Sequence, residues 1–260
     1  MLSGQTASRW RVVSGGPSAH LSWLSDDKGQ KAVLKVARDR SSRKLIEPFN
    51  EIVCYQLARL AGTSTAEIQL EWSGGEPCIL SVVESELNFS YVASGGVTLS
   101  DANLKSMATL FVTDWWLANT DRPQGKNEHL VVVKTDGGVS LVAIDYSHAL
   151  CGCSGEMFTV TTISDPTKIP IDSYNHIAEP YIKSFGDLQA GITGVLAIAD
   201  DAIDKVVDDS VVKVSEGRPV EEVTVLKSNA HLVKALLKSR RQTLNDTLMG
   251  WCWKKGKLTT

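Results

Sequence analysis

The 260-residue sequence has no excess of basic side chains: 27 Lys and Arg against 30 Asp and Glu leave a formal net charge of −3. Neutralising many phosphates needs a basic excess, so we do not expect bulk binding to nucleic acid. With 43% apolar and 22% charged residues, the composition is typical of a folded, soluble chain rather than a disordered one.

The five cysteines are too sparse and too uneven for the disulfide framework of a small secreted domain, so we expect a reducing, cytoplasmic setting. The N-terminal segment lacks an apolar core before a cleavage site. The longest uncharged helical stretch, 188–199, is well short of the about 20 residues that a membrane-spanning helix needs. We therefore expect neither secretion nor membrane association.

The sequence also lacks Gly-x-Ser-x-Gly and His-Glu-x-x-His motifs, which leaves hydrolase mechanisms without a nucleophile or a metal site. His148, Cys151 and Cys153 are metal-binding residue types, but they supply only three ligands at unusual spacing. Buried thiols are the alternative explanation for the two cysteines.

The first third of the sequence alternates short β-rich runs with turns. The runs 10–13, 20–24 and 31–36 are separated by Gly-Gly-Pro and Asp-Asp-Lys-Gly turns, and 68–72 and 78–83 flank a Gly-Gly turn. Between the third and fourth runs, apolar residues recur at helical spacing: Phe49, Ile52, Val53, Leu57 and Leu60. This pattern predicts five antiparallel strands with one helix inserted after the third.

From Ser100 onward the apolar periodicity becomes helical. A helix is predicted to start after Ser100, further helical segments at 180–209 and 229–249, and a hairpin at 130–133 and 139–144. The many aspartates near 180–209 are typical of a solvated helix face.

Lys35 interrupts the otherwise apolar run 32–36. A lysine there must find an anion or reach solvent, because burying an unpaired ammonium is costly. A phosphate, with Glu51 as a pairing carboxylate, would satisfy it, and Glu47 is the alternative partner. Exposure of Lys35 on an edge strand is the other explanation.

A turn of small residues precedes this lysine and contains Gly15, Gly16 and Ser18. Backbone N–H groups of such a turn can approach phosphates closely. A lone Gly-Gly turn also occurs in ordinary hairpins, so the signal is specific only in combination with others.

Three oxygen-bearing side chains follow apolar elements. Asp121 comes after the helix that starts beyond Ser100, Asn127 six residues later, and Asp145 at the end of an apolar strand. Magnesium with ATP phosphates prefers hard oxygen ligands, and a carboxylate can accept a hydroxyl proton. We therefore assign Asp121 as the catalytic residue, and Asn127 and Asp145 as metal ligands. A helix C-cap near Asp121 and an N-cap at Asp145 are the alternative.

These parts follow the order found in protein-kinase-like phosphotransferases: a small-residue turn, a strand lysine, a helix glutamate and a helical part with a polar hairpin. The segments 118–122 and 144–149, together with 50–62, resemble the HipA-like kinase family and, more distantly, lipid kinases. The similarity covers about residues 10–150.

The resemblance implies an α+β, two-lobed protein-kinase-like fold. The N-terminal lobe, residues 1–85, would carry the antiparallel sheet and one helix, and the C-terminal lobe, residues 86–260, would be mainly helical. It implies an ATP- and Mg²⁺-dependent kinase that phosphorylates a Ser or Thr hydroxyl of a protein substrate, in a toxin–antitoxin context with a regulatory partner protein. A nucleotide-binding pseudokinase that acts as an interaction module, and a lipid or small-molecule kinase, are the alternatives.

By the same resemblance, Asp121 is the catalytic aspartate, Asp145 the metal aspartate and Lys35 the ATP-binding lysine. Val83 and Glu84, at the end of the fifth strand, would contact the adenine.

The sequence departs from the family in the loop after Asp121. Relatives usually have His where this sequence has Pro123, and Asn five residues after the aspartate, whereas Asn127 is six residues away. A bulge at Pro123 and Gly125 would let Asn127 reach the metal. Alternatively, Lys126 occupies its place.

Overall fold

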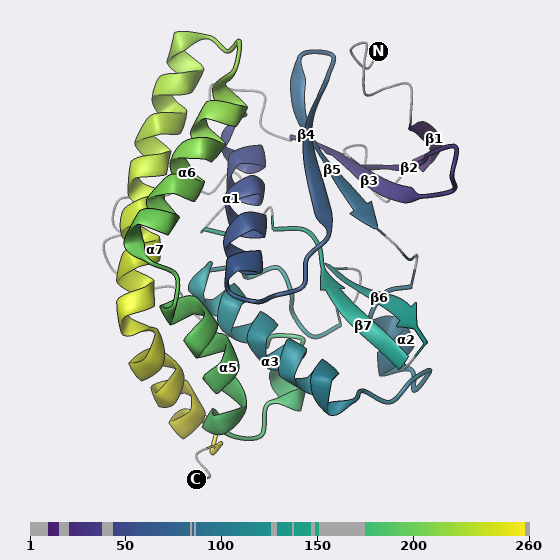
Figure 1. The fold of residues 1–260 in the computed structure, drawn as a ribbon, viewed down its shortest axis with the longest axis vertical. Helices are drawn as coiled ribbons and strands as arrows, with labels where there is room; N and C mark the ends of the chain where they lie inside the picture. The colour runs from purple at the N-terminus through teal and green to yellow at the C-terminus, as the bar shows by residue number, and fades with distance from the viewer. Residues whose placement is uncertain are drawn as a thin grey trace.

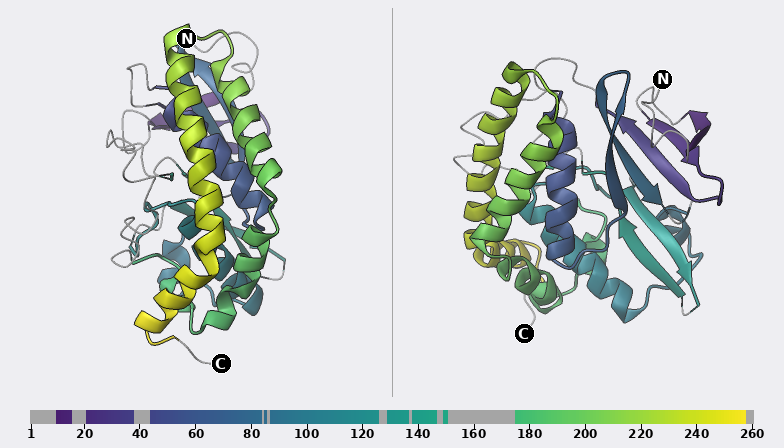
Figure 2. Two further views of the ribbon diagram at one scale, coloured as in Figure 1. Left: turned by 90° about the vertical axis from the view of Figure 1, so that its left-hand side faces the viewer. Right: turned by 45° about the horizontal axis from the view of Figure 1, so that its top comes forward.

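The computed structural model describes most of the chain. The described residues are 10–15, 21–37, 44–83, 85, 87–125, 129–136, 138–146, 149–150 and 175–257. Within them a five-stranded sheet stands beside a group of helices, and α1 (Ile46–Leu60) lies between the sheet and the two long helices α6 (Asp200–Ser215) and α7 (Val220–Lys254) (Figure 1; Figure 2, right).

The sheet has the strand order β1-β2-β3-β5-β4, and all neighbours are antiparallel. Its strands are β1 (Arg11–Gly15), β2 (Leu21–Ser25), β3 (Lys31–Val36), β4 (Glu67–Ser73) and β5 (Glu76–Val83). Gly74 and Gly75 join β4 to β5 with φ angles of +60° and +82°, which glycine adopts without strain. The predicted antiparallel sheet, with a helix after its third strand, is confirmed.

The two faces of β3 have different neighbours because side chains alternate along a strand. Ala32 and Leu34 belong to a small core that also contains Leu24. Lys35 lies on the other face, and its partner in β5 is Ile79, which packs in the main core with α1. Since β3 is flanked by β2 and β5, the alternative that Lys35 sits on an edge strand is wrong.

The remaining elements form the helical part of the protein. They are α2 (Ser90–Ala93), α3 (Asp101–Trp116), the 3-10 helix η4 (Glu179–Tyr181), α5 (Phe185–Leu196), α6 and α7, with a separate hairpin of β6 (Leu130–Thr135) and β7 (Gly138–Ala143). Ser100 caps α3 as predicted: its hydroxyl accepts the N–H of Asn103, whose side chain accepts the N–H of Ser100.

Two helical ranges differ from the prediction. The range 180–209 is divided between η4, α5 and α6, because the chain is extended at Ala199 (ψ 158°) before it enters α6. The helix expected at 229–249 continues in both directions as α7, which is 35 residues long. Even so, no helix among the described residues combines the length and the hydrophobicity needed to cross a bilayer.

Two aspartates of α6 form ion pairs with lysines of α7 in addition to facing solvent. Asp204 and Asp208 pair at 2.7 Å with Lys238 and Lys234 of α7. All four side chains remain partly exposed, so each pair stabilises the protein only weakly. The two pairs nevertheless connect α6 to α7 directly.

One continuous core joins α1 to α3, α5, α6 and α7. Two glycines of α5 permit close packing within it: a Cβ at Gly194 would lie 2.3 Å from the carbonyl oxygen of Ala61, and one at Gly191 would lie 2.9 Å from Cβ of Val112. α5 therefore fits against both α3 and the end of α1. The boundary between two lobes at residue 85 stays a prediction.

Candidate active site

Lys35 is only 7% exposed and is surrounded by three carboxylates. Its Nζ lies 2.7 Å from Oδ1 of Asp145, 3.0 Å from Oε1 of Glu51 and 3.8 Å from Oε1 of Glu47. The two glutamates lie one turn apart on α1, and Asp145 follows β7. The predicted ion pair of Lys35 with Glu51 is confirmed, and the alternative partner, Glu47, is also within ion-pair range.

Among the described residues, three carboxylates surround the single ammonium of Lys35. Burial by itself lowers the pKa of an ammonium, but Glu51, Asp145 and Glu47 outweigh this and hold the pKa of Lys35 well above its ordinary value. Burial raises the pKa of Glu51 to about 7, against the attraction of Lys35. The negative potential of these carboxylates attracts cations.

Asp145 has a φ of +61°, in the left-handed region that residues other than glycine rarely adopt. The hydroxyl of Tyr55, on α1, accepts a hydrogen bond from the backbone N–H of Asp145 at 2.9 Å. Tyr55 is itself buried and packs edge-on against Tyr146, with ring centroids 5.0 Å apart. The unusual backbone at Asp145 is therefore held by α1, and such conformations cluster at functional sites.

His129, immediately before β6, lies between Asp121 and Asp145. Its Nδ1 is 3.7 Å from Oδ2 of Asp121, and its Nε2 is 3.8 Å from Oδ2 of Asp145. One potential ligand atom from each of the three residues lies within 4.8 Å of the others. Carboxylate oxygens and imidazole nitrogens both bind metals, so this group is a candidate cation site. His129 is not among the residues predicted from the sequence.

A buried carboxylate on α3 organises the loop that follows this helix. Oδ2 of Asp114 accepts a hydrogen bond from Nε of Arg122 at 2.7 Å and lies 2.9 Å from Nε2 of His176. The N–H of Ala178 donates to Nδ1 of His176, so Nε2 carries the ring proton and donates to Asp114. Burial opposes ionisation of Asp114, but Arg122 outweighs it and holds the pKa of this carboxyl below its ordinary value.

Arg122 connects two segments of the candidate site. Its Nη1 donates to the carbonyl oxygen of His129 at 2.7 Å and to that of Ile144 at 2.5 Å. The guanidinium carbon also lies 4.6 Å from the ring centroid of Tyr146. One buried cation thereby fixes the backbone that carries His129 relative to the backbone that carries Asp145.

The end of α3 is held by α7. Nε of Arg240 donates to the carbonyl of Trp116 at 2.9 Å, and Nη2 of the same side chain donates to the carbonyl of Trp115. In the other direction, the indole N–H of Trp116 donates to the carbonyl of Leu237 at 2.9 Å. The last carbonyls of a helix have no partner within it, so the guanidinium satisfies them and anchors the start of the loop that carries Asp121.

The described residues include part of the predicted site. Lys35, Glu51 and Asp145 are in contact, and His129 links Asp145 to Asp121. Gly15 ends β1 and Val83 is buried at the end of β5. Outside the described residues lie Gly16, Ser18, Glu84, Lys126 and Asn127, as well as His148, Cys151 and Cys153.

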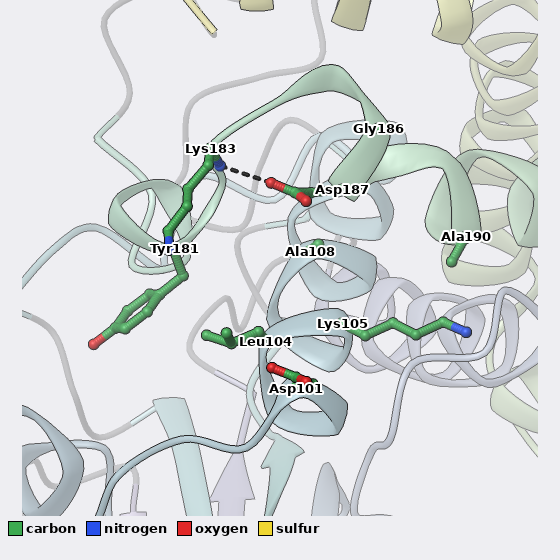
Figure 3. A pocket seen from close by; sticks show the side chains of 9 residues that line it. All are labelled: Asp101, Leu104, Lys105, Ala108, Tyr181, Lys183, Gly186, Asp187 and Ala190. Carbon is green, nitrogen blue, oxygen red and sulfur yellow. Dashed lines mark hydrogen bonds between the residues drawn. The ribbon is translucent and has the colours of Figure 1, made fainter. Parts of the chain in front are cut away.

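A separate cavity of about 380 Å³ lies on the helical part, between the first half of α3 and the start of α5 (Figure 3). Charges of both signs line it: Asp101 and Lys105 come from α3, and Asp187 accepts the backbone N–H of Lys183 at 2.8 Å. A helix rises about 1.5 Å per residue, so this cavity is distant from the loop at the far end of α3.

No protein-family model matches the chain, and no curated protein matches its sequence. Among solved structures, the fold is similar to the proinflammatory kinase CtkA of Helicobacter pylori, with a TM-score of 0.53, 12% identity, and coverage of 92% of this chain and 96% of that one. This similarity confirms the kinase-like fold expected from the sequence.

Two further solved structures are similar at lower TM-scores. HipA of the Shewanella oneidensis MR-1 toxin–antitoxin system, in a complex with HipB and operator DNA, has a TM-score of 0.43, 11% identity, and coverage of 95% of this chain and 69% of that one. The yeast RNA polymerase II CTD kinase complex CTDK-1 has a TM-score of 0.37, 11% identity, and coverage of 59% and 50%.

Proposed function

We propose that this protein is a phosphotransferase that binds ATP and a divalent cation beside Lys35 and transfers the γ-phosphoryl group to a Ser or Thr hydroxyl of a protein. The observation that carries the proposal is the buried contact of Lys35 with Glu51 and Asp145. An ammonium held by a carboxylate can bind phosphate oxygens, and a neighbouring aspartate can bind the accompanying cation. The fold shared with the kinase CtkA supports the same activity.

Each side chain has a distinct role in the proposed reaction. Bound ATP supplies the phosphoryl group, and a divalent cation offsets the charge of the phosphates. Lys35 binds phosphate oxygens in place of its contact with Asp145, while Glu51 keeps the ammonium oriented. Asp121 accepts the proton of the acceptor hydroxyl as the hydroxyl oxygen bonds to the γ-phosphorus and the bond from phosphorus to the β–γ bridging oxygen breaks, which releases ADP.

Calorimetry with ATP and either Mg²⁺ or Mn²⁺ tests the binding half of the proposal. Lys35→Met removes the ammonium, and we expect it to lose about tenfold or more in nucleotide affinity, since hydrogen bonds to charged groups contribute roughly 1.5–3 kcal/mol. Lys105→Met is the matched control, because Lys105 is exposed on α3 and belongs to the separate cavity. Circular dichroism checks that each variant folds.

Incubation of the wild type with γ-labelled ATP and a cell lysate tests the transfer half. Label recovered as phosphoserine or phosphothreonine in protein supports the proposal. Label found only in lipids or small molecules shows a different acceptor on the same fold. Nucleotide binding without transfer identifies a pseudokinase that acts as an interaction module. Absence of nucleotide binding contradicts the proposed function altogether.

A further inference from the structure

The hydrogen bonding of His129 defines which of its nitrogens is protonated. Nδ1 lies 2.5 Å from the backbone carbonyl oxygen of Asp121. A carbonyl oxygen only accepts hydrogen bonds, so Nδ1 carries the ring proton, and in the neutral ring Nε2 presents a lone pair. Nε2 lies 3.8 Å from Oδ2 of Asp145, which is too far for a hydrogen bond.

This spacing suits two ligands of one ion. Atoms that each bind a cation at about 2.0–2.3 Å lie roughly 3–4 Å apart when they are neighbours in its coordination shell. A metal-binding histidine usually donates its second ring N–H to a carbonyl or carboxylate, which fixes the ring orientation. His129 has this arrangement through its contact with Asp121.

The carboxylate of Asp145 is oriented so that one of its oxygens faces His129. Its Oδ1 accepts a hydrogen bond from Lys35 at 2.7 Å, while Oδ2 is the atom directed toward Nε2 of His129. Arg122 holds the backbone on both sides of this gap through the carbonyls of His129 and Ile144. The two potential ligand atoms are therefore positioned by buried contacts rather than by mobile surface side chains.

We propose that His129, together with Asp145, is a protein ligand of the divalent cation that accompanies ATP, and that it makes the site prefer Mn²⁺ to Mg²⁺. The inference rests on the proposed function, because it concerns the cation bound with the nucleotide. Mg²⁺ prefers oxygen ligands and gives up its water reluctantly. An imidazole nitrogen favours a first-row transition metal, and Mn²⁺ also accepts carboxylate oxygen. The ligands expected from the sequence, Asn127 and Asp145, are both oxygen donors.

Electron spin echo spectroscopy detects nitrogen bound to Mn²⁺ without measuring activity. The protein is labelled with ¹⁵N-histidine and loaded with Mn²⁺ and a non-hydrolysable ATP analogue, whose adenine nitrogens remain ¹⁴N. We expect a ¹⁵N signal in the wild type that disappears in His129→Gln. The signal should persist in His231→Gln, where the histidine is exposed on α7, and in His148→Gln and His20→Gln.

Calorimetry provides the second measurement. We expect His129→Gln to weaken Mn²⁺ binding about tenfold or more while Mg²⁺ binding changes little, since even contacts behind a metal ligand affect affinity by about 10–100-fold. Should His129→Gln fail to fold, persistence of the ¹⁵N signal in the other three variants assigns it to His129, because both nitrogens of His176 are already hydrogen-bonded.

The outcomes separate this inference from the proposed function. If ATP binds with a cation but the wild type gives no ¹⁵N signal, or if the signal survives in His129→Gln, the role of His129 is refuted and the proposed function stands. If the wild type binds ATP with neither cation, both fall together.

Discussion

Asp114 and His176 share a hydrogen bond of 2.9 Å although 62 positions separate them in the sequence. The same carboxylate oxygen accepts a hydrogen bond from Arg122, whose backbone carbonyl in turn accepts the N–H of Ile177 at 2.8 Å. Side-chain and main-chain contacts therefore join the loop after α3 to the segment that contains His176 and Ile177. Asp114 is the common acceptor of both side chains.

Removal of this carboxylate should destabilise the whole fold. In Asp114→Ala, the buried guanidinium of Arg122 loses the carboxylate of Asp114, and loss of one partner of a buried pair typically costs about 3–5 kcal/mol. Urea denaturation measures the free energy of unfolding. Asp209→Ala is the control, since Asp209 pairs with Lys205 on the exposed surface of α6 and should cost less than about 1 kcal/mol. Equal effects of the two variants would show that Asp114 does not anchor the loop.

The pKa of Glu51 predicts a dependence of stability on pH. Its value of about 7 in the folded protein is above the ordinary 4.5, so folding favours the protonated form. The corresponding stabilisation is complete below about pH 4.5 and is lost as the pH rises through about 7. Relative to Glu51→Gln, which cannot ionise, the wild type should lose stability between about pH 5 and pH 8. Glu221→Gln, on the exposed first turn of α7, is the control, and parallel curves for all three proteins would contradict the expectation.

The close packing of α5 predicts opposite effects for two glycine substitutions. In Gly194→Ala the added Cβ meets the carbonyl oxygen of Ala61, so the helices must separate and the melting temperature should fall. In Gly250→Ala the added Cβ meets nothing within 4 Å, and alanine favours a helix by up to about 1 kcal/mol over glycine, so the melting temperature should rise. Scanning calorimetry of both variants checks the expected signs.

Asp121→Asn tests the proposed acceptor of the hydroxyl proton. The substitution keeps the size of the side chain but removes its basicity, so nucleotide affinity should be retained while phosphotransfer falls by about 100-fold or more. Single-turnover assays with γ-labelled ATP measure the chemical step. Asp136→Asn, at the exposed turn between β6 and β7, should retain wild-type rates. Undiminished transfer by Asp121→Asn would remove this residue from the proposed mechanism.

The contact of Lys35 with Glu51 could be predicted from sequence because each half follows a local rule. A charged residue in an apolar strand needs a buried partner, and helical periodicity places Glu51 beside the apolar face of α1. The length of α7 and the break before Asp200 could not be predicted so well. They depend on packing against α3 and α6, which residues 229–249 and 180–209 do not reveal by themselves.

The proximity of His129 to Asp145 could not be predicted without the register of the hairpin. His129 immediately precedes β6, Asp145 lies two residues after the end of β7, and the pairing of Leu130 with Ala143 brings the two together. A single histidine without a spaced partner gives no such signal. The sequence does carry a signal for Asp114, because a carboxylate within an apolar helix requires a buried cation or hydrogen-bond donor.

The contact between Arg240 and the end of α3 bears on biosynthesis. During translation, Trp115 and Trp116 leave the ribosome more than 120 residues before Arg240, as the sequence separations of 125 and 124 show. Until α7 has been synthesised and has docked, the nascent polypeptide has no guanidinium to hold the last carbonyls of α3. The end of α3, from which the loop with Asp121 starts, therefore gains this support only after most of the chain has been made.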